Sequence, residues 1–394
     1  MKLSVIVLLT SVLLARLSFA ATFYVATNGD YSNDCAAAQN PSTPKRNITG
    51  ESGGVSCLTA GNGDILDIRG GTYSDHVTNV PSGTDWSNAA TIRAHGGETV
   101  TLIGGIALEG PSYVIFDGFR VITNGLWVGS TFEDGSNAGH HIRFVNLDVG
   151  PVDDGHLLSV SQWGHHVEVL GGKWHDAAYG TAGCSHSGTL ACYAFYIDGQ
   201  YNLIDNAKIY DNPSYAIHNY SGYPQRADQN VYRFNEIYNN GNNPASSQIS
   251  CAILLGSGDG NEAYGNIVRN NYVYGIASSF GATNSLIYNN TVYNNGSGGI
   301  SWGTGSGTII KNNIVYNNRV DFVDTDGVQA PTFANNLCSN AGPGCAQSGD
   351  PLFADPMNDD FTLLVGSPAK GAGTPYINAN VSMQFTPDIG AILP

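Results

Sequence analysis

Short apolar segments alternate with asparagines along the second half of the chain. The clearest copies of this unit are residues 205–210, 234–238, 265–269, 289–293 and 312–316, and Asn336 closes the series. The steps between successive asparagines are 29, 31, 24, 23 and 23 residues for Asn206, Asn235, Asn266, Asn290, Asn313 and Asn336. Fainter copies centre on Gly118, Asn146 and Gly172. A recurring unit of this length predicts a repeat architecture.

The length of the repeat selects among architectures. A step of 23 residues is too short for a strand and a crossover helix, which need ~30 residues or more. A β-propeller blade repeats at ~40 residues or more. The step suits one coil of a parallel β-helix, with three short strands joined by tight turns. Asn tolerates left-handed backbone conformations and can bond to an Asn in the next coil. We therefore predict an all-β solenoid of about 22–25-residue coils with an Asn ladder at one turn.

The segment after each Asn pair is predicted to form another strand, whose side chains alternate between the interior and the outer surface. In two neighbouring copies the outward residues are Tyr196 with Asp198, and His218 with Tyr220. Corresponding positions are 22 residues apart, so we expect them on adjacent coils, ~4.8 Å apart. Outward positions of the other copies are Ser, Ala or Leu. The predicted inward residues are Phe195, Ile197, Ile217, Ile253, Ile276, Ile300 and Phe322.

The N-terminal residues 1–20 are predicted to form an export signal. Lys2 precedes an apolar run from Val5 to Leu14, and Ser18-Phe19-Ala20 has the pattern of a cleavage site. The run is too short to span a bilayer, and no later segment reaches the ~20 apolar residues that spanning requires. We therefore expect a secreted protein, extracellular or periplasmic, in which residues 21–394 form one domain.

Composition and charge restrict the partners. Only 12% of the residues are charged, and the net charge is -16. A nucleic-acid-binding protein is expected to carry a basic stripe, which this chain lacks. The negative charge repels a polyanion at long range, but a local cationic cleft could still bind an acidic polysaccharide. We expect a monomer that binds a polysaccharide and no nucleic acid.

The cysteines fall into close pairs. In an exported protein, short-range pairs indicate disulfides that close loops rather than metal ligands. No pair has the Cys-x-x-Cys spacing of a zinc site. The expected disulfides leave Cys251 without an assigned partner, and they are Cys35–Cys57, Cys184–Cys192 and Cys338–Cys345.

Both ends of the mature chain resemble a known superfamily. Residues 22–30 and 63–73 resemble the N-terminal cap and first coil of the pectate-lyase-like β-helix superfamily. Residues 350–356, 366–369 and 388–391 are similar to the closing segment common in its bacterial members. The resemblance implies a right-handed parallel β-helix over nearly the whole mature chain. It leaves the activity open, because lyases, hydrolases, epimerases and proteins without known activity share these motifs.

The outward cluster on the two neighbouring coils is the first candidate site. A β-elimination on a uronic acid needs a donor for the carboxylate, a base for the C5 proton and an acid for the leaving oxygen. Arg226 could hold the carboxylate, His218 could act as the base, and Tyr220 or Tyr223 could donate the proton. Asp198 could orient His218 or bind Ca²⁺. The alternatives are a sugar-stacking platform and an ordinary surface.

Three longer insertions, at 173–193, 220–230 and 239–251, flank these strands, and insertions in repeat proteins usually cluster on the binding face. Tyr196, Tyr223, Lys173 and His175 are the predicted substrate-binding residues.

A second cluster is rich in carboxylates and histidines. The adjacent Asp153 and Asp154 are candidate Ca²⁺ ligands, because hard cations prefer oxygen donors. The alternative is that these residues are solvated turn positions. The cluster comprises Asp148, Asp153, Asp154, His156, Lys173, His175 and Asp176. The pairs His140-His141 and His165-His166 recur at equivalent strand starts, and repetition of the unit accounts for them, although stacked histidines could also bind a metal.

Together these observations predict a secreted carbohydrate-active enzyme. The favoured activity is a polysaccharide lyase that cleaves uronate-containing glycans by β-elimination. An inverting glycoside hydrolase, with carboxylates ~6.5–9.5 Å apart, is the first alternative. A non-catalytic glycan-binding or surface β-helix is the second.

Overall fold

The computed structural model describes residues 19–153, 155–178, 193–222, 227–242, 250–327 and 330–375, together with 377–378, 381–382 and 388–391. In these residues the regular structure consists of β-strands and short 3-10 helices, without an α-helix. The predicted all-β class is therefore confirmed. No helix in the described residues has the length and apolarity needed to cross a membrane.

Most strands belong to three long parallel sheets, which we call sheets A, B and C. The order in sheet A is β1 (Thr22–Val25), β2 (Ile65–Ile68), β4 (Ala90–Ala94), β7 (Ser112–Asp117), β10 (His140–Val145), β13 (His165–Leu170), β16 (Leu203–Asp205), β19 (Val231–Arg233), β22 (Glu262–Tyr264), β26 (Leu286–Tyr288), β30 (Ile309–Lys311) and β33 (Thr332–Ala334). The order in sheet B is β3 (Gly71–Tyr73), β5 (Val100–Leu102), β8 (Arg120–Thr123), β11 (Asp148–Val152), β14 (Lys173–His175), β17 (Lys208–Tyr210), β20 (Glu236–Tyr238), β23 (Ile267–Arg269), β27 (Thr291–Tyr293), β31 (Ile314–Tyr316), β34 (Leu337–Cys338) and β35 (Gln347–Ser348). The order in sheet C is β6 (Ile106–Glu109), β9 (Leu126–Gly129), β12 (Leu158–Val160), β15 (Phe195–Ile197), β18 (Ile217–Asn219), β21 (Cys251–Gly256), β24 (Tyr274–Ser279), β28 (Gly298–Trp302) and β32 (Phe322–Asp324).

The remaining elements are small. Three two-stranded sheets pair β25 (Ala282–Thr283) with β29 (Gly305–Ser306), β36 (Phe353–Asp355) with β37 (Asp360–Leu363), and β38 (Ile377–Asn378) with β39 (Val381–Ser382). The 3-10 helices are η1 (Ala37–Gln39), η2 (Gly54–Cys57), η3 (Trp86–Asn88) and η4 (Pro356–Asn358).

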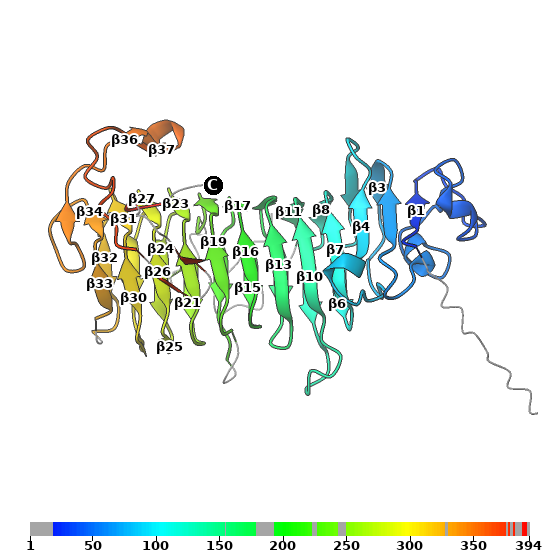
Figure 1. Ribbon diagram of the computed structural model, residues 1–394, viewed down its shortest axis with the longest axis horizontal. Helices are drawn as coiled ribbons and strands as arrows, with labels where there is room; N and C mark the ends of the chain where they lie inside the picture. The colour runs from blue at the N-terminus through cyan, green and yellow to red at the C-terminus, as the bar shows by residue number, and fades with distance from the viewer. Residues whose placement is uncertain are drawn as a thin grey trace, which may run out of the picture.

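From β4 to β32 the chain passes through sheets A, B and C in the same order in each coil, so the coils stack into an elongated right-handed parallel β-helix (Figure 1). In the C-terminal coils, register partners in sheet A are 23 residues apart, as in Leu286, Ile309 and Thr332. The repeat in the sequence is therefore the coil itself. Insertions lengthen the coils in the middle of the chain, where Val231 pairs with Glu262.

The interior contains one continuous apolar core built from all three sheets. Side chains at the same level of successive coils stack, as the rings of Phe116 and Phe144 do at 5.7 Å. Within one coil, Trp174 of sheet B packs at 4.7 Å against Phe195 of sheet C. The predicted inward residues of sheet C, from Phe195 to Ile300, are at most 1% exposed. Phe322 is partly buried against the same core. Alternation along each short strand therefore assigned the interior correctly.

Asparagine ladders line two turns. At the turn from sheet A to sheet B, each ladder Asn accepts hydrogen bonds at Oδ1 from the backbone N–H and Nδ2 of the Asn one coil earlier. Its own Nδ2 also donates to a main-chain carbonyl. This ladder contains Asn235, Asn266, Asn290, Asn313 and Asn336. The ladder at the turn from sheet B to sheet C contains Asn212, Asn240, Asn271, Asn295 and Asn318.

The ladders differ in two ways from the single ladder predicted. A short third one joins Asn202, Asn230 and Asn261. The series also does not begin at Asn206, which has a φ of 56° and precedes the ladder position. In that coil Ala207 donates its backbone N–H to Asn235. The first residue of each pair adopts the left-handed conformation, as in Asn294 with a φ of 52°, and the second supplies the buried amide.

An N-terminal segment covers the outer edge of β1. Lys45 forms a parallel bridge with Val25, and its backbone exchanges hydrogen bonds of 2.9 Å with Tyr24 and Ala26. The Lys45 side chain is 4% exposed, and its Nζ donates to the carbonyls of Asn33 and Ser52. The predicted Cys35–Cys57 disulfide is present in this segment.

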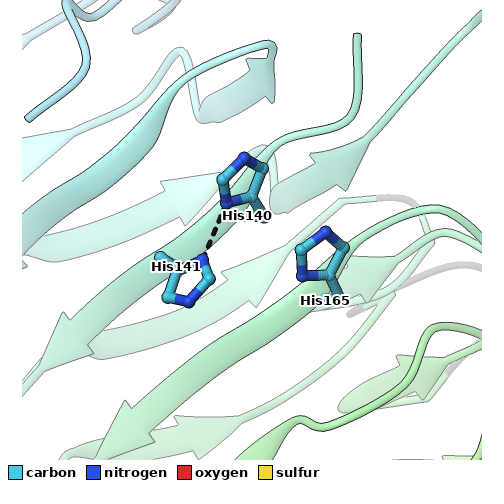
Figure 2. A group of neighbouring side chains, drawn as sticks. All are labelled: His140, His141 and His165. Atoms are coloured by element: carbon cyan, nitrogen blue, oxygen red, sulfur yellow. Dashed lines mark hydrogen bonds between the residues drawn. The ribbon is translucent and has the colours of Figure 1, made fainter. Parts of the chain in front are cut away.

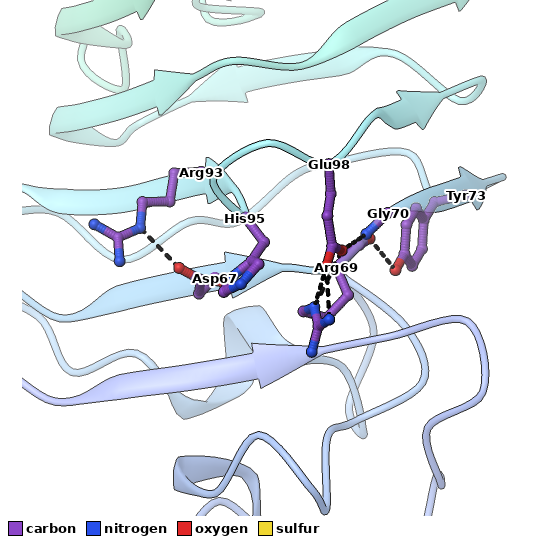
Figure 3. A network of polar contacts seen from close by, with 7 residues as sticks. All are labelled: Asp67, Arg69, Gly70, Tyr73, Arg93, His95 and Glu98. Carbon is purple, nitrogen blue, oxygen red and sulfur yellow. Dashed lines mark hydrogen bonds and ion pairs between the residues drawn. The ribbon is translucent and has the colours of Figure 1, made fainter.

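Ion pairs connect the first coils on the outer face of sheet A (Figure 3). Asp67 accepts a hydrogen bond from Arg93 at 2.9 Å and contacts His95 at 2.6 Å. Glu98 binds Arg69 at 2.6 Å and accepts from the backbone of Gly70. The hydrogen bond from Arg69 is the main reason that the pKa of Glu98 falls to about 2. These ion pairs join the coil of β2 to that of β4.

The C-terminal end folds back along the side of the solenoid (Figure 1). Asn289 Nδ2 donates to the carbonyl of Asp388, and the backbone N–H of Gly390 donates to the carbonyl of Asn312. The predicted Cys338–Cys345 disulfide closes the loop after β34. The proposed partners Cys184 and Cys192 lie outside the described residues. Cys251 is buried and forms no disulfide in the structure.

Candidate functional site

The outer face of sheet C brings together most of the residues first proposed as a site. Tyr196 on β15 pairs in register with His218 on β18, which pairs with Leu254 on β21. Tyr220 follows β18, and its backbone N–H donates to Ile197 at 3.1 Å, which places it one coil from Asp198. The predicted adjacency of these four residues on neighbouring coils is therefore correct.

The prediction that His218 is exposed is wrong. It points away from the coil interior, but only 4% of it is exposed. Its ring stacks on Tyr193 at 4.6 Å and Tyr196 at 5.3 Å, and Tyr215 approaches edge-on at 4.6 Å. Tyr220 lies 5.7 Å away at a tilt. Alternation fixes only whether a side chain faces the core, and here outward aromatic rings from adjacent coils pack against one another.

Sequence reasoning assigned His156 to the carboxylate-rich cluster, whereas the structure places it beside the tyrosines. Its ring stacks on Tyr193 at 5.0 Å and on Tyr196 at 5.1 Å. The buried Nδ1 atom has no hydrogen-bond partner among the described residues. Burial lowers the pKa of His156 to about 4, so the ring is neutral at pH 7. We call His156, Tyr193, Tyr196, Tyr215, His218 and Tyr220 the aromatic cluster.

The aromatic cluster has a partly exposed edge. Tyr196, Asp198 and Tyr220 are each partly buried, whereas Tyr215 is 2% exposed. Tyr196, Asp198 and Tyr220 are therefore residues of this region that are open to solvent, whereas His218 and Tyr215 are almost fully buried. Tyr223 and Arg226, the other proposed members of this site, lie outside the described residues, as does Asp154.

Lys173 and His175, proposed as substrate-binding residues, are on the outer face of sheet B rather than sheet C. His175 Nε2 contacts Asp148 at 3.0 Å, and Nδ1 contacts Asp176 at 2.7 Å. The ring also stacks on Tyr210 at 5.0 Å. Burial alone would lower the pKa of His175, but the hydrogen bonds to Asp148 and Asp176 outweigh it and raise that pKa. The hydrogen bond from His175 lowers the pKa of Asp148.

These opposite pKa shifts predict how His175 contributes to stability. Its contribution should be fully present below its ordinary pKa of 6.5 and lost as the pH rises through the raised value. The contribution of Asp148 should be present above its ordinary pKa of 3.8 and lost as the pH falls through the lowered one. We expect an NMR titration midpoint of His175 above 6.5, and a lower one in Asp148→Asn. Tyr210→Phe, which keeps the stacked ring, should not change it. A midpoint at or below 6.5 in the unmodified protein would contradict the assignment.

The expected Ca²⁺ ligation by Asp153 and Asp154 stays a prediction, because Asp154 lies outside the described residues. Asp148 and Asp176 both bind His175, and an imidazole is a poor neighbour for a hard cation that prefers oxygen donors. Asp153 is exposed. Within the described ranges, the one set of three or more His, Cys, Asp or Glu side chains close enough to share a metal ion consists of histidines on sheet A.

Comparisons with known proteins agree with the fold. A family model described as the right handed beta helix region matches residues 183–350. The solved structure of pectate lyase Pel9A has 15% identity and a TM-score of 0.64, covering 95% of this chain and 96% of its own. A variant of the PL6 family alginate lyase AlyGC has 16% identity and a TM-score of 0.47, covering 83% and 55%. The GH136 lacto-N-biosidase from Eubacterium ramulus has 10% identity and a TM-score of 0.45, covering 81% and 67%. No curated protein matches the chain.

Proposed function

We propose that this pectate-lyase-like β-helix is a secreted protein that binds a polysaccharide on the outer face of sheet C and cleaves uronate-containing chains by β-elimination. The observation that carries the proposal is the aromatic cluster, with His218 at its centre and Asp198 beside Tyr220. Aromatic rings offer flat apolar faces with polar tips, which suit a sugar ring. The disulfides found in the described part of the chain, Cys35–Cys57 and Cys338–Cys345, agree with an oxidising compartment.

The proposed reaction assigns one role to each group. His218, as a neutral imidazole, removes the C5 proton of the uronate next to the scissile bond. Arg226 stabilises the carboxylate while charge develops there. Tyr220 donates a proton to the leaving glycosidic oxygen, and the electrons of the C5–H bond form the new double bond. Asp198 orients His218. Because His218 is buried, a covering ring has to move before the base reaches the substrate.

The burial of His218 also favours a second candidate, which is glycan binding without catalysis. In this case the partly exposed edge of the aromatic cluster stacks on the sugar, and the buried His218 ring packs against the tyrosines and holds them in place. Tyr196 would contact the glycan directly, as its ring is partly exposed.

A panel of pectate, alginate and neutral glycans separates these functions. A lyase would release products with the ultraviolet absorbance of an unsaturated uronate, and only from the acidic glycans. New reducing ends without that absorbance would indicate a hydrolase. Binding by calorimetry without either product would support the second candidate. Absence of both binding and cleavage across the panel would reject a role in acidic-glycan recognition.

A further inference from the structure

Two pairs of histidines lie together on the outer face of sheet A, away from the aromatic cluster. His140 and His141 begin β10, and His165 and His166 begin β13; we call these four residues the histidine quartet. His140 pairs in register with His165. Figure 2 shows three of them, with His141 facing His140 within one coil and His165 on the next. The Nδ1 atoms are 2.7 Å apart in the first pair and 2.8 Å apart in the second.

A backbone feature creates this arrangement. Ile142 is fully buried, so strict alternation would direct His140 into the core. His141 has a φ of 53° and His166 a φ of 54°, and these left-handed residues interrupt the alternation. As a result both imidazoles of each pair emerge on the outer face, where all four are partly exposed. His adopts this conformation more readily than most residues do, and the neighbouring coils show it at the equivalent Tyr113 and Tyr201.

The rings form a two-by-two array. His140 stacks on His165 at 4.7 Å, and His141 on His166 at 4.5 Å, with planes within 8° of parallel. One nitrogen from each of His140, His141 and His165 lies within 4.8 Å of the others. Glu168 is paired with Arg143 at 2.7 Å beside the array, so the nearest charged groups neutralise each other. Burial is the largest cause lowering the pKa of each imidazole, to about 4 for His141 and His165.

We propose that the histidine quartet binds a divalent late transition-metal ion, with Cu²⁺ preferred, through Nδ1 of His140 and His141 and a third nitrogen from His165. Two cis ligands of a square-planar ion are about 2.8 Å apart and those of a tetrahedral ion about 3.3 Å, given metal–nitrogen bonds of about 2.0 Å. The distance between the two Nδ1 atoms of each histidine pair is close to the square-planar value. The proton shared between the two Nδ1 atoms moves to Nε2 of its own ring, so both lone pairs face the ion.

The donor set and its spacing restrict the ion. Imidazole suits Cu²⁺, Ni²⁺ and Zn²⁺, and affinity in a nitrogen site generally rises toward Cu²⁺. Ca²⁺ and Mg²⁺ prefer oxygen donors. We expect one ion per chain, because the two pairs are only one coil apart and two dications at this separation would repel each other. The ion would link the coils of β10 and β13.

Calorimetric titration of the full-length protein tests the proposal. We expect binding of one Cu²⁺ with nitrogen hyperfine structure in its EPR spectrum, weaker binding of Ni²⁺ and Zn²⁺, and no binding of Ca²⁺. The double variant His140→Gln/His141→Asn should bind Cu²⁺ roughly 100-fold more weakly. Asn at position 141 tolerates the left-handed conformation. His76→Asn, at an exposed histidine of another coil, is the matched control and should bind as the unmodified protein does.

Two results would overturn the proposal: Cu²⁺ affinity unchanged in the double variant, or an EPR spectrum without nitrogen ligands. If circular dichroism shows that the double variant does not fold, His165→Gln replaces it. This variant leaves both left-handed residues in place and should still weaken Cu²⁺ binding. Bound Cu²⁺ should also raise the melting temperature of the unmodified protein but not that of a folded variant, because only the native site binds the ion.

Discussion

His218→Ala is expected to lower turnover on the cleaved glycan by at least ~100-fold, because a positioned general base contributes that much or more. The variant should also lose about 2–4 kcal/mol of unfolding free energy, since removing the buried ring leaves a cavity among Tyr193, Tyr196 and Tyr215. Turnover per folded molecule therefore has to be measured, with the folded fraction taken from the denaturation curve.

Leu254→Ala provides the matched control for His218→Ala. Leu254 occupies the next register position on the same face and is 1% exposed. Its truncation should cost about 2–4 kcal/mol but removes no titratable group, so turnover per folded molecule should persist. If His218→Ala retained full turnover, the base would have to be sought near Asp153. If it lost only stability, His218 would support the tyrosines without taking part in the chemistry.

The largest stability loss is expected from Asn295→Ala. Asn295 Oδ1 accepts two hydrogen bonds from Asn271, and its Nδ2 donates to Asn318 and to the carbonyls of Val268 and Tyr293. The residue is 1% exposed. Each buried group left without a partner costs about 1–3 kcal/mol, so the total should exceed about 3 kcal/mol in the unfolding free energy from chemical denaturation.

The preceding residue is the matched control for the ladder. Asn294 is exposed and has a φ of 52°, which Gly adopts readily. Asn294→Gly should therefore change the unfolding free energy by less than about 1 kcal/mol. If Asn294→Gly and Asn295→Ala lowered the unfolding free energy equally, the Asn pair would stabilise the coil through the conformation of the turn and not through the buried amide.

The periodicity of the sequence was sufficient to predict the architecture and the strand register of the candidate site. The 22-residue spacing placed Tyr196 beside His218 because each coil adds one strand to sheet C. Burial of His218 could not be predicted in the same way, because it depends on how outward rings such as Tyr193 and Tyr215 pack outside the coil. The left-handed conformations of His141 and His166, which place both rings of each pair outside, likewise could not be predicted from the repeat.

The repeat in the sequence also could not predict where the residues of the carboxylate-rich cluster lie. Lys173 and His175 follow a Gly pair rather than an Asn pair, and they belong to sheet B. His156 lies only three residues from Asp153, yet the turn into sheet C carries it to the tyrosines. Residues close in sequence thus separate at the corners of the coil, where small changes in turn length decide which face receives a side chain.

The segment that covers β1 has a consequence for how copies of the chain can associate. A parallel solenoid has an open row of main-chain donors and acceptors at each end, and the two ends are complementary, so subunits could stack end to end into a fibre. Growth of such a fibre needs both ends of every subunit. Because Lys45 already bonds to the main chain of β1 around Val25, the first strand of sheet A cannot offer a free row of donors and acceptors to a second copy, which disfavours head-to-tail polymerisation.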